Sequence, residues 1–225
     1  MVSIAVVVWL SNMIATHNGR QVIVTPDQFK QQAEVGADLA QPGVSNFNMG
    51  KEITPQQRKD LERAAGIFDS LDDYKPTESA GYFEAGLCYY LIGDTDTALN
   101  RVQQSLNNAA VNPPLDTVQG RANLEGVVGD CHHLISLIAF DRKQYDMAIS
   151  ESSAALQHRN DRPLYYVARA RAEIEKSSQD QQKTGKVSAD DKALVKAASS
   201  DLKAALKLYP NFPPAVQLEG LVSQP

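Results

Sequence analysis

Residues 82–98 read YFEAGLCYYLIGDTDTA, and the rest of the chain is interpreted outward from this stretch. Four small or aromatic residues recur at spacings of three and four, which places them on one face of a helix: Tyr82, Ala85, Gly86 and Tyr89. Gly93 and Asp94 interrupt the pattern as a turn does, and Ala98 begins a second series. The stretch therefore predicts a helical hairpin, which becomes stable by stacking on similar hairpins.

The second helix of this hairpin has counterparts along the chain. Ala64 and Ala98 lie 34 residues apart, and Ala148 and Ala198 continue the series at intervals of 50 residues, or 34 plus 16. One insertion falls around residues 111–129. The other is the polar segment 177–191, SSQDQQKTGKVSADD, which we expect to form a solvated loop. A period of this length predicts an array of helical repeats.

Helix start signals predict two helices before the quoted stretch. Thr25-Pro26-Asp27 precedes a short helix over 28–39, which Gln41-Pro42-Gly43 is expected to end. Thr54-Pro55 opens a helix that runs to about Tyr74, with proline in its first turn. A last helix is expected over 213–222.

These spacings resemble the tetratricopeptide repeat (TPR), a 34-residue helix-turn-helix with the pattern W-x2-L-G-x2-Y, then A-x3-F, then P. Tyr82-x2-Ala85-Gly86-x2-Tyr89 is similar to its first helix, residues 143–149 (KQYDMAI) to its turn, and residues 206–211 (LKLYPN) to its end. Val102 and Ser152 depart from the pattern, because they replace its large aromatic residue. The resemblance implies an all-α, TPR-like helical-hairpin solenoid of three to four hairpins, with a separate apolar N-terminal segment.

We expect three parts in the chain, of which the resemblance covers the last and implies a binding surface there. The parts are an apolar segment over 1–24, a short helix and linker over 25–43, and the repeat domain over 44–225. In TPR proteins the first helix of each unit lines a groove that holds a partner. At matching positions the groove residues are Phe83, Leu87, Tyr90, Leu91, His133, Leu137, Phe140, Val167, Arg171 and Ile174. These residues fit a protein partner that presents an apolar helix or an extended segment, unless the chain's own residues 28–39 or 215–222 cover the groove.

Other chemistries receive little support from the composition. The net charge of −5 and the scattered Lys and Arg residues argue against a nucleic-acid partner. His132 and His133 are adjacent, so on a helix they point about 100° apart and cannot grip one metal ion from one face. Cys88 and Cys131 are expected to be buried and unpaired. We expect no cofactor, no metal and no enzymatic activity.

The first residues form the most apolar run of the chain, VSIAVVVWL over 2–10, and no charged residue precedes Arg20. Three interpretations stay open: a membrane anchor, a cleaved secretory signal, and a β-hairpin around the turn residues Asn18 and Gly19. We favour the anchor, which places the protein at a membrane. The alternative is a soluble cytoplasmic or periplasmic protein. The sequence thus predicts a membrane-tethered scaffold or assembly factor, or alternatively an accessory structural subunit of a membrane protein complex.

Overall fold

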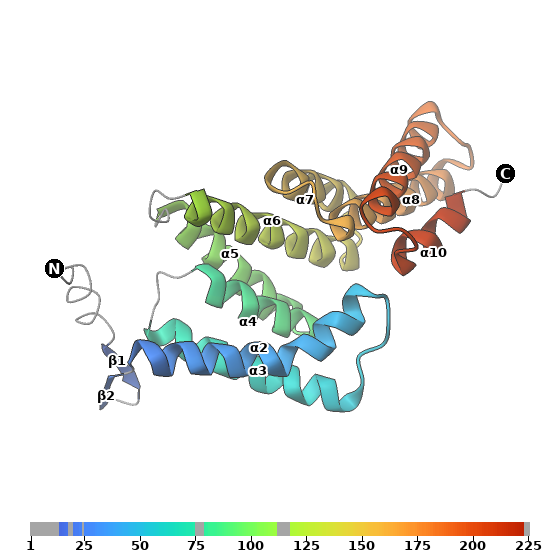
Figure 1. The fold of residues 1–225 in the computed structure, drawn as a ribbon. Helices are drawn as coiled ribbons and strands as arrows, with labels where there is room; N and C mark the ends of the chain where they lie inside the picture. Colours follow the sequence, from blue (N-terminus) through green and yellow to red (C-terminus); the bar gives the residue numbers. More distant parts are fainter. Residues whose placement is uncertain (1–13, 18–19, 24, 75–78, 112–117, 223–225) are drawn as a thin grey trace. The chain divides into compact units, whose positions relative to one another are not determined.

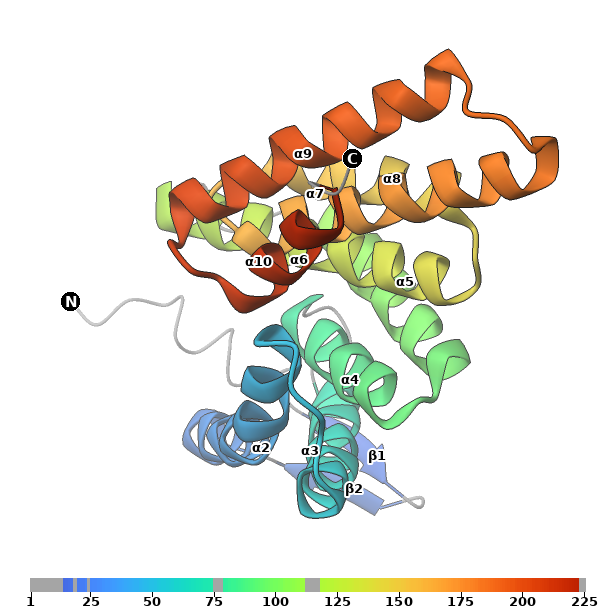
Figure 2. The same ribbon diagram turned by 90° about the vertical axis from the view of Figure 1, so that its right-hand side faces the viewer.

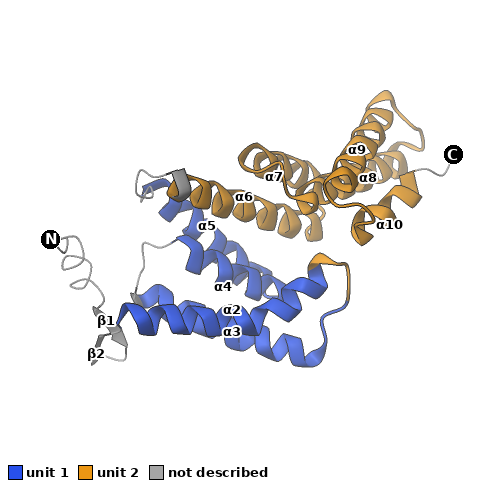
Figure 3. Cartoon of the chain, viewed as in Figure 1, with its two compact units in different colours: residues 1–47, 52–113 blue, residues 48–51, 114–225 orange. Residues whose placement is uncertain are grey.

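The computed structural model describes residues 14–17, 20–23, 25–74, 79–111 and 118–222. They belong to two compact units (Figure 3). Unit 1 takes residues 1–47 and 52–113, and unit 2 takes residues 48–51 and 114–225. Apart from one short hairpin, every regular element that the structure describes is an α-helix, so the predicted all-α fold class is confirmed (Figure 1).

The described chain begins with a β-hairpin and not with a spanning helix. Strands β1 (Ile14–His17) and β2 (Arg20–Ile23) pair antiparallel, with Ile14 opposite Ile23 and His17 opposite Arg20. This register leaves two residues between the strands, as the hairpin interpretation predicted. A two-stranded hairpin is marginal alone, and β1 lies against helix α3 of the same unit.

The predicted membrane anchor is therefore wrong. The last residues of the predicted anchor, Ile14–His17, form strand β1. They pair with β2 and are therefore not helical. Among the residues that the structure describes, no helix combines the length and the apolar composition needed to cross a bilayer. Residues 1–13, which carry most of that predicted anchor and of the secretory-signal alternative, lie outside the described part.

Helix α2 (Pro26–Asn48) continues nine residues beyond the predicted helix over 28–39. It begins as expected, because Thr25 and Gln28 cap each other through backbone N–H groups at 3.0 and 3.2 Å. The expected end at Pro42 is wrong. Gly43 packs directly on Leu61, where an added Cβ would lie 2.9 Å from the leucine, and the Pro42 carbonyl accepts from Gln57 at 3.2 Å. Packing of the last turns outweighs the roughly 3 kcal/mol that an interior proline costs.

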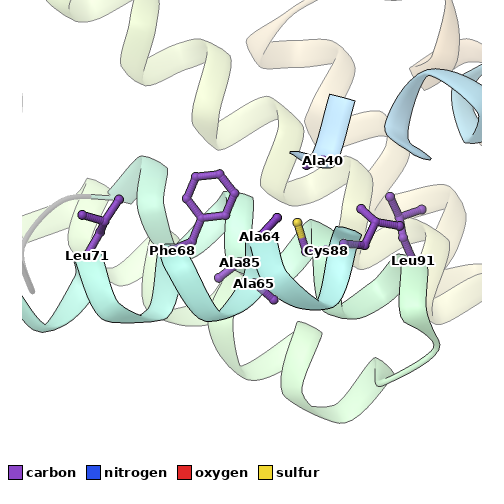
Figure 4. Close-up of a cluster of buried hydrophobic side chains, with 9 residues drawn as sticks. Ala40, Ala64, Ala65, Phe68, Leu71, Ala85, Cys88 and Leu91 are labelled. Atoms are coloured by element: carbon purple, nitrogen blue, oxygen red, sulfur yellow. The ribbon is translucent and has the colours of Figure 1, made fainter. Parts of the chain in front are cut away.

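Unit 1 continues with α3 (Pro55–Tyr74), α4 (Ser79–Ile92) and α5 (Thr95–Val111). The bounds of α3 are the predicted ones, and α4 and α5 are separated at Gly93 and Asp94, where the turn was predicted. The turn residue Gly93 has a φ of +95°, a left-handed conformation that glycine adopts without strain. Gly86 lets α5 approach, because a Cβ there would lie 3.0 Å from Val102 and 3.2 Å from the Ala98 carbonyl. The core of unit 1, shown in Figure 4, consists of Ala40, Leu61, Ala64, Ala65, Phe68, Leu71, Ala85, Cys88 and Leu91.

Residues 118–222, the main described part of unit 2, form α6 (Val118–Asp141), α7 (Tyr145–His158), α8 (Pro163–Thr184), α9 (Ala189–Leu208) and α10 (Pro213–Val222). Each packs on the next along the chain, and α6 also contacts α8 (Figure 2). Helices α6 and α8 are thus the first helices of two stacked hairpins, α7 and α9 are the second helices, and α10 covers the last hairpin.

The predicted solvated loop over 177–191 is wrong. Residues 177–184 extend α8, and Ser177 and Asp191 are each only 1% exposed. Ser188 and Asp191 form a capping box at the start of α9: the Ser188 hydroxyl accepts from the Asp191 N–H at 3.0 Å, and the Asp191 carboxylate accepts from the Ser188 N–H at 2.7 Å. The connection between the two helices is therefore only residues 185–188.

Candidate protein-binding surfaces

The predicted partner-binding residues of unit 1 lie on α4, and most of them pack inside the unit. Leu91 is 5% exposed and belongs to the core, so we no longer count it among residues that contact a partner. Leu87 and Tyr90 are half-buried against the same core. The Tyr90 ring meets Phe47 of α2 edge to face, with centroids 5.7 Å apart. Phe83 is half-buried and lies outside this core cluster of described residues.

In unit 2 the six predicted residues fall on two helices that contact each other. His133, Leu137 and Phe140 are spaced by four and three on α6, and Val167, Arg171 and Ile174 repeat this spacing on α8. Val167 is 8% exposed and packs in the core with Ala170 and Leu202, so it too offers a partner almost no surface. Ile174 is half-buried against that core.

Phe140 and Arg171 meet across these two helices. The guanidinium carbon of Arg171 lies 4.0 Å from the centroid of the Phe140 ring, a cation–π contact. Arg171 is exposed, and within the described residues it forms no ion pair and no hydrogen bond. Its N–H groups therefore remain available above an aromatic surface. This pair is the part of the predicted groove in which an apolar contact and a hydrogen-bond donor lie side by side.

His133 links α6 to α8 and contributes no charge to a surface. Its ring lies 4.9 Å from that of Tyr165, which is 1% exposed and donates a hydrogen bond to Asp130. Burial lowers the pKa of His133 to about 4, so the imidazole is neutral near pH 7. Burial raises the pKa of Asp130, and the Tyr165 hydrogen bond opposes that change. His133 is thus a packing residue.

A buried ion pair, which the sequence did not predict, joins α8 to α9. Arg169 donates to both carboxylate oxygens of Asp201, at 2.6 and 2.8 Å, and Asp201 is 6% exposed. Glu173, one turn after Arg169, is also 6% exposed, and its Oε2 atom finds no hydrogen-bond partner among the described residues. Burial, and then the Asp201 carboxylate, raise the pKa of Glu173 to about 7. Its charge therefore changes near neutral pH.

Two histidines between α6 and α7 pair with carboxylates. The Nδ1 atom of His132 lies 2.8 Å from Oε2 of Glu151, and the Nδ1 atom of His158 lies 2.5 Å from Oε2 of Glu125. The two imidazole rings stack with centroids 5.6 Å apart. In the part of the chain that the structure describes, no group of three His, Cys, Asp or Glu side chains is placed to hold a metal ion. His132 and His133 contact different neighbours, Glu151 and Tyr165, as their adjacent positions on a helix predict.

No disulfide bond joins Cys88 and Cys131, and each is fully buried. Cys88 lies in the core of unit 1, where burial raises the pKa of its thiol to about 12. A thiol with that pKa carries almost no thiolate at neutral pH, so it is a poor nucleophile.

Comparison with solved structures also supports the fold. No protein-family model and no curated protein sequence matches this chain. Among solved structures, this chain is similar to a chain of the crystal structure of the APC/C hetero-tetramer Cut9-Hcn1, with a TM-score of 0.57 and 15% sequence identity. That alignment covers 88% of this chain and 32% of the matched one, so this chain spans about a third of its length.

Two further structures show weaker similarity. MamA residues 41 to the end from Desulfovibrio magneticus RS-1 align with a TM-score of 0.48 and 12% identity, over 85% of this chain and 83% of MamA. YrrB, a TPR protein with an unusual peptide-binding site, aligns with a TM-score of 0.33 and 13% identity, over 85% of this chain and 97% of YrrB. The fold assignment uses the Cut9-Hcn1 similarity and the stacked hairpins. On that basis the chain is a TPR-like protein by fold, an all-α array of helical hairpins.

Proposed function

We propose that this protein is a protein–protein interaction scaffold. We further propose that a partner binds along α6 and α8, the first helices of the two hairpins in unit 2. The observation that carries the proposal is the Phe140–Arg171 pair, an exposed guanidinium that lies 4.0 Å above an aromatic ring and forms no ion pair within the described residues. Leu137 and Ile174 flank this pair with half-buried apolar side chains.

The chemistry of the pair defines the partner segment. An apolar side chain of the partner packs beside the Phe140 ring, and a carboxylate or backbone carbonyl accepts hydrogen bonds from Arg171. Stacked hairpins hold the two helices together, so this arrangement is present before the partner binds and costs little to order. The Cut9-Hcn1 structure is a hetero-tetramer, which is consistent with a protein partner for this fold. The proposed activity is binding, without catalysis and without a cofactor.

The positions on α4 take a smaller part in the proposal. Leu87 and Tyr90 pack against the core of unit 1, so their substitution changes stability together with any binding. Phe83 remains a candidate contact in that unit. The test therefore uses unit 2, where Arg171 can be replaced at an exposed site.

The experiment compares the wild type with Arg171→Glu and with Lys59→Glu, an equal charge reversal at an exposed site of unit 1. Each tagged protein is purified from the cells that express it, and bound proteins are quantified by mass spectrometry. We expect at least one stoichiometric partner to be lost from Arg171→Glu and kept by Lys59→Glu, while the helical circular-dichroism signal of both is unchanged. Retention of every partner by Arg171→Glu would remove the basis of the proposal.

A further inference from the structure

A hollow surface lies along α9, the second helix of the last hairpin. A cleft of about 770 Å³ runs along α9 and reaches the end of α8 and the last described turn of α10. Three valines give it an apolar lining: Val187 from the α8–α9 turn, Val195 from α9 and Val222 from α10. Val187 is 57% exposed, which is large for an aliphatic side chain next to a hollow.

Three lysines line the same cleft along one side of α9. Lys192, Lys196 and Lys203 are spaced by four and seven residues, so they share one helical face, and all three are exposed. Within the described residues, the ammonium group of each forms no ion pair and no hydrogen bond. The row is about 17 Å long at 1.5 Å per residue. A row of uncompensated lysines is a local exception in a chain whose net charge is −5.

The acidic side chains of α9 do not neutralise this row. Asp201 is held by Arg169 on the buried side of the helix. Asp191 lines the cleft, but it is 1% exposed and caps the helix N-terminus through the Ser188 N–H. Asp190 is two residues from Lys192, and residues at that spacing do not face each other on a helix. The described lining thus carries three exposed lysines against one buried carboxylate, that of Asp191.

We propose that this cleft binds an acidic peptide segment of a partner protein. Carboxylates of the segment pair with Lys192, Lys196 and Lys203, and an aliphatic side chain between them enters the space between Val187, Val195 and Val222. About five extended residues span the 17 Å row, at roughly 3.3 Å per residue. The surface differs from that of the proposed function, because it lies on a second helix and shares no residue with the Phe140–Arg171 pair.

An apolar hollow favours a peptide over the other polyanions. The lining contains no aromatic side chain on which a nucleic-acid base would stack. An anionic bilayer needs a basic surface that faces outward, whereas here the valines lie within a concave lining. Charge and an apolar concavity together match a segment in which acidic and aliphatic residues alternate.

The test uses the full chain and a fluorescein-labelled nonapeptide in which leucine alternates with aspartate and glutamate. Fluorescence anisotropy gives the Kd for the wild type, for Lys196→Glu with Lys203→Glu, and for the matched control Lys30→Glu with Lys59→Glu, which changes the net charge equally at exposed sites of unit 1. A second variant, Val187→Ser, tests the apolar lining. A peptide with serine in place of leucine, a single-stranded oligouridylate and phosphatidylserine vesicles serve as competing ligands.

We expect the Lys196→Glu, Lys203→Glu variant to bind the peptide at least about tenfold more weakly than the control variant. Val187→Ser and the serine peptide should each weaken binding severalfold, and added salt should weaken it further. Arg171→Glu should bind this peptide as the wild type does, which separates this site from the proposed function. The inference is overturned by absence of wild-type binding, by an equal loss in the control variant, or by a lysine-dependent preference for the oligouridylate or the vesicles.

Discussion

The buried Glu173 carboxyl predicts how the stability of unit 2 depends on pH. Glu173 is 6% exposed, its Oε2 atom has no hydrogen-bond partner among the described residues, and the neighbouring Asp201 carboxylate is already paired with Arg169. The pKa of Glu173 is raised from 4.5 to about 7, first by burial and then by Asp201, while Arg169 acts in the opposite direction. The folded state therefore favours the neutral carboxyl.

The sign and size of the effect follow from proton linkage. Between pH 4.5 and about 7 the folded state binds more protons at Glu173 than the unfolded state does, so stability falls as pH rises through this window. The stabilisation is complete below pH 4.5 and lost above pH 7. A pKa difference of about 2.5 units, at ~1.4 kcal/mol for each, corresponds to about 3–4 kcal/mol. Glu173→Gln, which is neutral at every pH, should therefore be more stable than the wild type at pH 8 by up to about 3–4 kcal/mol and nearly equal to it at pH 4.5.

Urea unfolding, followed by circular dichroism at pH 4.5 and at pH 8, measures the difference between the two proteins. Hydrogen exchange in α8 and α9 assigns the change to the correct hairpin. Glu175→Gln is the matched control, because Glu175 lies on the same helix and is exposed. Its effect should be small and independent of pH. A Glu173→Gln difference that is the same at both pH values, or a loss of stability at pH 8, would refute the reasoning.

Two further predictions concern packing inside the units. Tyr165→Phe removes the hydrogen bond to the half-buried Asp130 and should lower the free energy of unfolding by about 1–3 kcal/mol in urea denaturation. An unchanged urea midpoint would contradict a role for that bond. Gly86→Ala should destabilise unit 1, because its Cβ would lie 3.0 Å from Val102 and 3.2 Å from the Ala98 carbonyl. At Gly66 no atom lies within 4 Å of an added Cβ, so Gly66→Ala should instead raise the melting temperature, through a helix-propensity gain of about 0.5–1 kcal/mol. A Gly86→Ala variant that is more stable than Gly66→Ala would refute this account of Gly86.

The sequence predicted the hairpins well where local signals and packing agree. Thr54-Pro55 and Gly93-Asp94 mark the helix boundaries because capping and left-handed backbone are local requirements. Pro42 predicted the wrong end for α2, because the packing of Gly43 on Leu61 is a tertiary contact that no local signal reports. The polar segment 177–191 was wrongly predicted as a loop for another reason. Its composition indicates solvation, although Ser188 and Asp191 have the spacing of a capping box.

The candidate sites were predicted in part. The repeat pattern selected Phe140 and Arg171 on two successive first helices, and the structure brings their side chains together. The same pattern does not separate exposed from buried positions within a helix, which is why it also selected Leu91 and Val167. The Arg169–Asp201 pair was missed because its members are 32 residues apart in sequence. One signal was present, since Asp201 falls on the face of α9 that carries the buried Ala198, Leu202 and Ala205.

Site-specific photo-crosslinking tests the central claim, a partner surface on α6 and α8, most directly. A photoreactive phenylalanine analogue replaces Phe140, which keeps an aromatic ring beside Arg171, or replaces the exposed control residue Lys59, and the chain is irradiated in the cells that express it. The account predicts a discrete, stoichiometric crosslink to another protein from position 140 and no such product from position 59. The absence of a crosslink from position 140 when position 59 gives one would contradict it.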